Sequence, residues 1–481
     1  MAHHLVNGIP PHLSTWRHVR EYAVPASMIH TATARRVVGD WAGACAAARI
    51  DVDLDLRTAR HRYGTELVTR LRTDLRRLAP DLLRWHMPRI VGDGRLRPGL
   101  TVRLARYHLP GVTPPALVVR TPPAWADTGQ RMSLALWDGS LKDAPRHHPH
   151  PHPHRRFRLD LHRHLWDATR SGDLARRGGG IAPAGGDPSD PDPERDMPWA
   201  VSRWAAEAEI LLRADSCTER LFTVRLGVQD HGVYEIVAPD DGHVPTLRVA
   251  RGSSTHLDVA ALPLLPEAAA RVPPDLELLR RGLITVERLH PLVAEALTPG
   301  GSATPPPAAE PDGPQRVECR GQSHRIALRD GVLAAIDHHP EQLRREELLM
   351  ALGGPGLPCL RAIDTVHRNP EDLPAIRERL RHGDFTGAFA VLERLLGPAA
   401  TLRPGPLRDE LEAAVAGRVA HGLFRSGLAE PLQRSGIDDP RSGTERGRPG
   451  GDHRPRITRR TPPAVRRKRD SRGRSRTAQS R

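Results

Sequence analysis

The chain of 481 residues lacks long hydrophobic stretches, and aromatic residues make up only 4% of it. No uninterrupted run of about 18 apolar residues occurs, so the sequence predicts no transmembrane helix and no membrane partner. The opening residues, MAHHLVNGIPPHLSTW, show no basic start followed by an apolar segment, which argues against a secretory signal peptide. We therefore expect a cytoplasmic protein.

Cysteine is scarce, and no two cysteines form a CxxC pair. This spacing argues against a zinc ribbon, a thioredoxin-like motif and a disulfide-rich secreted scaffold. The pattern favours buried free thiols in a reducing compartment. The four cysteines are Cys45, Cys217, Cys319 and Cys359.

Lysine is nearly absent, with only Lys142 and Lys468, so arginine supplies almost all of the positive charge. This bias is typical of a high-GC genome and is not by itself a sign of phosphate binding. Residues 434–481 hold 16 Lys and Arg against 5 Asp and Glu, so +11 of the net charge of +15 lies there and +4 remains for the body. The tail is predicted to be disordered and to bind nucleic acid weakly, without sequence preference. Its polyanion-binding candidates are Arg459, Arg460, Arg466, Arg467, Lys468 and Arg469.

Catalytic signatures are also missing. The sequence has no GxSxG, no HExxH, no Walker A motif and no GxGxxG after a strand. It therefore predicts no cofactor and no catalytic residue. We interpret the chain as a non-enzymatic adaptor or regulatory protein with a protein partner. A metal-dependent hydrolase that uses His and Asp clusters, and a nucleic-acid binder that uses the tail, are the alternatives.

The periodicity of the body predicts an α+β fold with small antiparallel sheets. Residues 14–89 have a helical pattern, in which Leu67, Leu71, Leu75, Leu78 and Leu82 form one apolar stripe. The interleaved arginines of that segment should face solvent. Short strands are expected at 100–107, 116–121 and 131–137, and the same helix-then-strands order recurs at 198–250, with Asp230-His231-Gly232 as a hairpin turn. A third small sheet is expected at 316–337, followed by helices at 341–428.

Segments rich in Pro and Gly separate these regions. The predicted division is a helix-plus-sheet domain at 1–141, a His-rich and Pro/Gly-rich linker region with a short strand and helix at 142–197, a second helix-plus-sheet domain at 198–297, a linker at 298–314, a small sheet plus mostly helical domain at 315–430, and the basic tail at 431–481.

Histidines alternate with prolines in the first linker, and imidazole is a good ligand for zinc, nickel and copper. The prolines keep this tract extended, so a spacer with incidental metal affinity is the favoured interpretation. Its metal candidates are His147, His148, His150, His152 and His154.

Asp337-His338-His339, after a strand-like stretch, resembles the signature triplet of the DHH phosphoesterases. That resemblance implies a two-metal site completed by an Asp-x-Asp motif, for which the comparable stretch is Asp51-Val52-Asp53-Leu54-Asp55. A helix start at Pro340-Glu341 is the other interpretation.

Gly383-Asp384-Phe385-Thr386-Gly387-Ala388 resembles the second helix of a tetratricopeptide repeat, and Gly39-Asp40-Trp41-Ala42-Gly43-Ala44 has the same opening. The resemblance implies close packing of paired helices. Two ordinary helices, each capped by its aspartate, would produce the same pattern.

Overall fold

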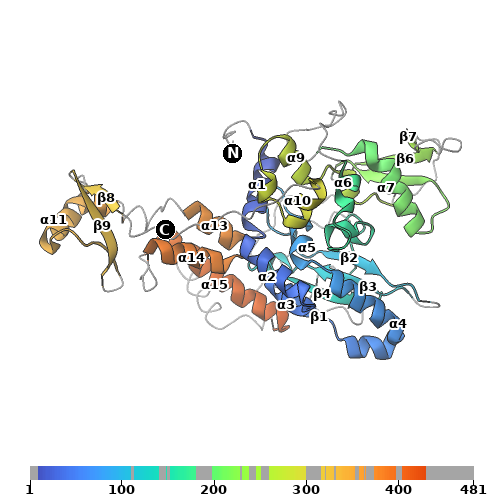
Figure 1. Cartoon of the computed structure of the whole chain (residues 1–481), viewed down its shortest axis with the longest axis horizontal. Coiled ribbons are helices and arrows are strands. Elements are labelled where there is room, and N and C mark those ends of the chain that lie inside the picture. Colours follow the sequence, from blue (N-terminus) through green and yellow to red (C-terminus); the bar gives the residue numbers. More distant parts are fainter. Residues whose placement is uncertain are drawn as a thin grey trace, which may run out of the picture. The chain divides into compact units, whose positions relative to one another are not determined.

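A computed structural model shows the architecture of the chain (Figure 1). Residues Met1–Glu430 form one compact unit and Pro431–Arg481 a second. The structure describes residues 9–109, 113–139, 148, 152–179, 198–227, 230–237, 245–250, 259, 261–298, 316–319, 321–329, 332–352, 357–361, 363, 373–396 and 404–428. All of them belong to the first unit, whereas the predicted basic tail lies outside the described residues.

Helices dominate the first ninety residues because apolar side chains recur there at helical spacing. The leucine stripe from Leu67 to Leu82 is buried as predicted, and Arg70, Arg72, Arg76 and Arg77 are exposed. The helices are α1 (Pro11–Tyr22), α2 (Ala26–Val37), α3 (Trp41–Ala47), α4 (Leu56–Arg77) and α5 (Pro80–His86).

One strand interrupts this segment, so the prediction of helix throughout 14–89 is wrong at β1 (Ile50–Asp53). The strand joins a four-stranded sheet in the order β1-β4-β3-β2. The other strands are β2 (Thr101–Arg106), β3 (Ala116–Arg120) and β4 (Met132–Trp137), close to their predicted positions. They pair antiparallel, whereas β1 pairs parallel with β4.

The second predicted region contains α7 (Val201–Ala214) and an antiparallel sheet in the order β5-β6-β7. Its strands are β5 (Leu221–Arg225), β6 (His231–Val237) and β7 (Thr246–Val249). His231 and Gly232 belong to β6, so the predicted turn was placed too late along the chain. The smaller helices nearby are η1 (Ala124–Ala126), η2 (Leu159–Leu161), η3 (Arg163–Leu165), α6 (Asp173–Gly178), α8 (Glu267–Ala270), α9 (Pro274–Arg280), η4 (Val286–Arg288) and α10 (Pro291–Leu297).

The C-terminal part of the first unit has the predicted order of a small sheet followed by helices. Its strands β8 (Arg316–Cys319), β9 (Gln322–Arg329) and β10 (Val332–Ala335) form an antiparallel sheet with β9 in the centre. The helices are α11 (Pro340–Ala351), α13 (Leu373–Arg381), α14 (Phe385–Leu396) and α15 (Pro406–Arg425). The predicted α+β fold with small antiparallel sheets is therefore confirmed.

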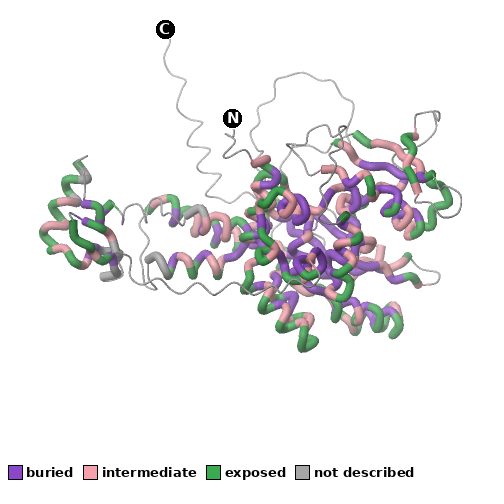
Figure 2. The backbone as a smooth tube through the Cα atoms, turned by 45° about the horizontal axis from the view of Figure 1, so that its top comes forward, coloured by how far each residue is buried: buried purple, intermediate pink, exposed green. Residues whose placement is uncertain are grey.

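Three hydrophobic cores of substantial size lie among the described residues. The largest combines α1–α5 and the first sheet with residues 272–297, which come from the second predicted domain. A second core joins α7 to the sheet β5-β6-β7. A third joins Cys319 and Ile326 of the small sheet to α13, α14 and α15. Figure 2 shows buried residues concentrated in the packed helices and strands.

Candidate anion-binding site

One cross-strand row of the first sheet places polar residues of three strands on the same face. Asp51 of β1 pairs with Ser133 of β4, and Ser133 pairs with Arg120 of β3. Directly paired residues point to the same side, and neighbouring strands are about 4.8 Å apart. The alternate positions of these strands, such as Ile50, Met132 and Val119, face the largest core. The row is thus a polar strip on the face opposite that core.

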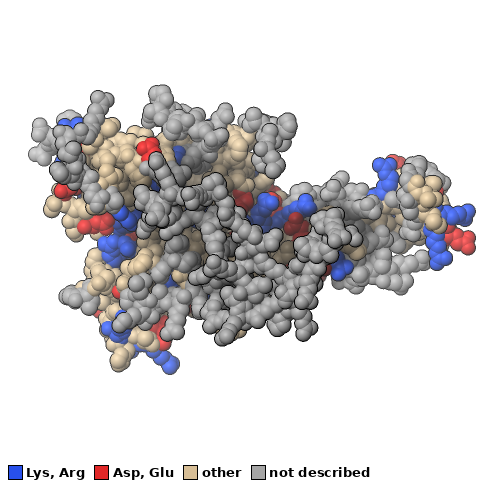
Figure 3. All heavy atoms as spheres, turned by 180° about the vertical axis from the view of Figure 1, so that it is seen from behind, with Lys and Arg blue, Asp and Glu red and all other residues tan. Residues whose placement is uncertain are grey.

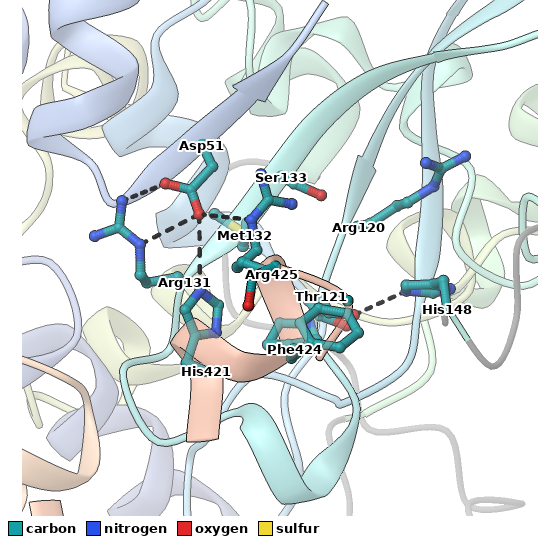
Figure 4. Close-up of a pocket in the computed structure, with 13 residues that line it drawn as sticks. Asp51, Arg120, Thr121, Arg131, Met132, Ser133, His148, His421, Phe424 and Arg425 are labelled. Carbon is teal, nitrogen blue, oxygen red and sulfur yellow. Dashed lines mark hydrogen bonds and ion pairs between the residues drawn. The ribbon is translucent and has the colours of Figure 1, made fainter. Parts of the chain in front are cut away.

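The C-terminal turn of α15 covers this strip. His421, Phe424 and Arg425 of the helix line a pocket of about 220 Å³ together with the row, and Figure 4 shows them next to Asp51. The helix is held by the His421 ring, whose Nδ1 donates to the Ala126 carbonyl oxygen at 3.0 Å, and by Phe424, which packs edge-on against Trp125. The pocket therefore joins segments about 370 residues apart in the chain.

Asp51 is the centre of a cation cluster. Arg131 Nη2 and Nε both donate to its carboxylate, the latter at 3.3 Å, and Arg425 Nε and His421 Nε2 lie 3.6 and 3.7 Å from Oδ2 (Figure 4). Burial alone would raise the pKa of Asp51, but the nearby His421 ring, the hydrogen bonds from Arg131 and the charge of Arg425 hold it well below its usual range. Arg425 also contacts Asp53. Asp51 is therefore ionised and its charge is already balanced.

Arg120 has the opposite surroundings. Its side chain lines the pocket and is only 5% exposed, yet among the described residues no carboxylate lies within ion-pair distance of it. Its Nε is buried without a hydrogen-bond partner. Burial lowers the pKa of Arg120, and the charge of Asp53 opposes this only in part. Figure 4 shows the Arg120 guanidinium on the side of the pocket away from the Asp51 cluster, and His148 lies on that same side.

The lining as a whole favours an anion. It contains three arginines and two histidines against one aspartate: Arg120, Arg131, Arg425, His148, His421 and Asp51. A guanidinium presents parallel N–H donors that match a carboxylate or phosphate. The volume lies below the range of about 300–1,000 Å³ that is usual for drug-sized ligands, so it suits one acidic group.

A Ser-His-Asp arrangement does not arise in this pocket, although all three residue types line it. Both ring nitrogens of His421 face oxygen acceptors, the Ala126 carbonyl and the Asp51 carboxylate. Among the described residues no serine or threonine hydroxyl is hydrogen-bonded to either nitrogen, as a nucleophile would be to its general base. The Thr121 hydroxyl donates to the Arg97 carbonyl oxygen at 2.6 Å and accepts from Leu100 N. The geometry thus provides binding groups and no activated nucleophile.

The predicted histidine tract contributes one residue to the pocket. His148 is buried, and its Nε2 lies 3.0 Å from the Thr121 carbonyl oxygen. His152 packs edge-on against Trp137, and His154 Nδ1 accepts from Arg156 N. These three engage different neighbours and do not converge on one point. His147 and His150, like the six tail residues from Arg459 to Arg469 named above, lie outside the described residues.

The two stretches of the DHH resemblance have separate roles. Asp51 and Asp53 bind the arginines of the pocket, and Asp55 caps α4 by accepting from Arg57 N and Thr58 N. Asp337 is bound by Arg325, at 2.9 Å from Nη2. In the described part of the chain, the side chains whose ligand atoms lie within metal-binding reach of one another are Cys319, His338 and Cys359.

The sequence contained a signal for Asp51 but none for its partners. Arg120 ends an apolar strand and is one of many arginines, and His421 lies on a helix near the end of the first unit. A charged residue directly after a buried apolar run, as in Leu117–Arg120, was the available hint for Arg120.

Comparison of the chain with protein-family models, with curated proteins and with solved structures finds no match. No described helix combines the length and the apolar character needed to cross a membrane.

Proposed function

We propose that the protein is a non-enzymatic adaptor or regulatory protein that binds an acidic segment of a protein partner. Arg120 carries this proposal. Burying an unpaired guanidinium costs several kcal/mol unless a counter-ion compensates for it. A carboxylate or phosphate group of a partner would provide that counter-ion in the pocket.

The exposed apolar face of α15 supports the inference that the acidic group belongs to a protein. Val415, Val419 and Leu423 lie at steps of four and are 56%, 58% and 41% exposed. These residues form one stripe on the outer side of the helix, whereas Leu407, Ala414 and His421 face inward. Leu423 lies in the same helical turn as the pocket residues Phe424 and Arg425, so the apolar strip ends on a face of the helix next to the anion pocket.

Some exposed charges elsewhere are paired with each other. On the face shown in Figure 3, Arg and acidic atoms lie close together on the described surface. Arg248, for example, donates to Glu235 from both Nε and Nη2. Such exposed pairs contribute little to stability or binding.

A cytoplasmic location is part of the proposal. It is supported by the four cysteines, which all remain free thiols in the structure, as is usual in a reducing compartment.

Peptide-display selection tests the proposal without a known partner. The full chain would be the bait, with Arg120→Gln and the matched control Arg248→Gln selected in parallel. We expect enrichment of peptides with an acidic residue near spaced leucines on the wild type and on Arg248→Gln, and at least tenfold weaker binding of the same peptides to Arg120→Gln. Selected peptides without acidic residues, or with equal affinity for Arg120→Gln, would contradict the proposal.

A further inference from the structure

The third core contains a cluster of metal-binding side chains away from the anion pocket. Cys319 ends β8, His338 follows β10, and Cys359 lies in the short helical segment 357–361. One ligand atom from each of the three lies within 4.8 Å of the other two. Both cysteines are buried, with 1% and 0% exposure, and His338 is half-buried. Two thiols and an imidazole thus meet from three segments.

A second histidine lies beside this cluster. His324 of β9 pairs with Val317 of β8, so it is on the same face of the sheet as Val317 and Cys319, which alternate along β8. Its ring stacks on His338, with centroids 4.1 Å apart and planes inclined by 22°. The Nδ1 atom of His324 is buried and forms no hydrogen bond within the described residues. A second imidazole therefore lies beside the cluster, outside the set whose ligand atoms lie within 4.8 Å of one another, and reaches the same point only after its ring rotates out of the stack.

The donor set is that of a structural zinc site. Zinc takes four ligands in a tetrahedron, with Zn–S near 2.3 Å and Zn–N near 2.0 Å, and Cys₂His₂ is one of its common ligand sets. Soft thiolates favour zinc over magnesium, calcium or manganese. Such bond lengths place ligand atoms somewhat closer together than the upper limit of 4.8 Å found here, a difference that small side-chain rotations close.

A metal at this position would stabilise the small sheet. The sheet β8-β9-β10 consists of three short strands, and two of them have four residues. A sheet of this size is stable only through its hydrophobic face or packing against a helix, and a metal cross-link would add to that. A metal bound by Cys319 and Cys359 would cross-link the edge strand β8 to the segment 357–361, whose Leu357 and Leu360 belong to the same core.

We propose that Cys319, His338 and Cys359 bind one zinc ion, that His324 is the fourth ligand, and that the metal fastens the small sheet to the helical segment 357–361. The 4, 13 and 20 residues that separate successive ligands differ from the paired CxxC pattern of zinc ribbons, so the cysteine spacing did not indicate the site. The proposal is independent of the anion pocket.

Metal content of the untagged full chain tests this site. The protein would be produced with added zinc, dialysed against a weak chelator, and its zinc measured by mass spectrometry. We expect one zinc per chain in the wild type and none in Cys319→Ser/Cys359→Ser. Cys45→Ser/Cys217→Ser is the matched control and should retain the metal. His152→Ala/His154→Ala should also retain it, which excludes the histidine tract as its source. Wild-type protein without zinc, or a double Cys319/Cys359 variant that keeps it, would overturn the proposal.

Two measurements on the wild type do not depend on how the variants fold. Replacement of zinc by cobalt should give the visible and charge-transfer absorption of a tetrahedral thiolate site, and X-ray absorption should count two sulfur ligands. Titration of thiols in the unfolded, metal-free chain should find all four cysteines reduced, whereas two missing thiols would indicate a disulfide and overturn the metal site. His324→Ala should lose zinc to a chelator at least tenfold more readily; equal retention would remove His324 from the ligand set.

Discussion

Two arginines of this protein are both buried, but only one of them has a carboxylate as an ion-pair partner among the described residues. Arg20 is 4% exposed and donates to Asp275 from Nε at 2.6 Å and from Nη2 at 3.1 Å. Arg120 is buried to a similar degree without an ion-pair partner among the described residues. Removing one member of a buried pair costs about 3–5 kcal/mol, whereas removing an unpaired buried charge relieves a desolvation penalty.

The pair therefore gives a prediction at the scale of one residue. Arg120→Met should increase the free energy of unfolding by about 1–3 kcal/mol in buffer without multivalent anions, because the buried charge is replaced by an apolar chain of similar length. Arg20→Met should decrease it by about 3–5 kcal/mol. Urea unfolding of both variants measures the difference. A loss of stability in Arg120→Met would show that the guanidinium is already compensated.

The two Gly-Asp-aromatic motifs differ in what surrounds their glycines. Gly39 and Gly383 both have left-handed backbones, with φ of +81° and +76°. A Cβ at Gly39 would meet no atom within 4 Å, whereas one at Gly383 would lie 2.3 Å from the Gly129 carbonyl oxygen. The second motif is thus pressed against the loop before β4.

We accordingly predict unequal costs for the same substitution. Gly39→Ala should lose about 1 kcal/mol, the cost of a left-handed alanine. Gly383→Ala should lose about 3 kcal/mol, because the clash with a backbone oxygen is added to that cost. Chemical denaturation of the two variants is the measurement, and equal losses would mean that the contact with Gly129 is not present in solution.

At the scale of elements, both motifs form capped helix pairs. Asp40 accepts from Gly43 N at 2.8 Å at the start of α3, and Asp384 accepts from Gly387 N at 3.2 Å at the start of α14. Asp384 also accepts a hydrogen bond from Arg49 Nη2 at 3.1 Å. This bond joins the helix pair α13–α14 to the residues that follow α3. The predicted capping aspartates are present, and the resemblance to a tetratricopeptide repeat is confined to these two helix pairs.

Helix α7 is fastened through one buried carboxylate. Glu207 lies 3.2 Å from His162 Nε2, and Arg177 Nε donates to it at 2.9 Å. Burial alone would raise the pKa of Glu207, but hydrogen bonds from His162 and Arg177 lower it to about 2 from 4.5. Because the folded value lies below the unfolded one, its stabilisation is present above pH 4.5 and is lost as the pH falls toward 2.

Glu207→Gln should therefore reduce the free energy of unfolding at pH 7 by about 3 kcal/mol and flatten its dependence on pH below 4.5. Glu209→Gln, on the same helix and outside any recorded ion pair among the described residues, is the control and should keep the wild-type slope. Unfolding curves between pH 3 and 7, a range that includes the unfolded-state pKa of 4.5, give both quantities. A wild-type slope in Glu207→Gln would assign the acid sensitivity elsewhere.

The elements that the sequence predicted well are those with a strong periodic signal. The leucine stripe of α4 and α5 and the strands β2, β3 and β4 each have several apolar residues in register, bounded by Pro or Gly. Strand β1 was not predicted, because it has only four residues, two of them acidic, and forms by pairing with β4. The two sites could not be predicted for a related reason, because their residues come together only through tertiary packing. These are Asp51, Arg120 and His421 in the anion pocket, and Cys319 and Cys359 in the metal cluster.

At the scale of the whole molecule, basic charge is concentrated in residues 434–481. If about six of its arginines contact phosphates, the logarithm of the affinity for duplex DNA should fall with the logarithm of salt concentration at a slope of about −5. A chain ending at Gln433 should lose this low-salt binding while retaining anion binding at Arg120. Filter binding over a salt series tests it, and DNA affinity that survives the truncation would place the nucleic-acid site in the body.

The central claim is that buried Arg120 binds an anion that the described residues of the chain do not supply. Arginine Nε–H signals in a ¹H–¹⁵N spectrum of the full chain test it directly, with inorganic phosphate as the probe and Arg120→Met to assign the signal. Because Nε of Arg120 is buried without an acceptor, the account predicts a saturable shift of its signal during the titration and no shift for Arg248, which is bound to Glu235. An Arg120 signal that stays in place at saturating phosphate would contradict it.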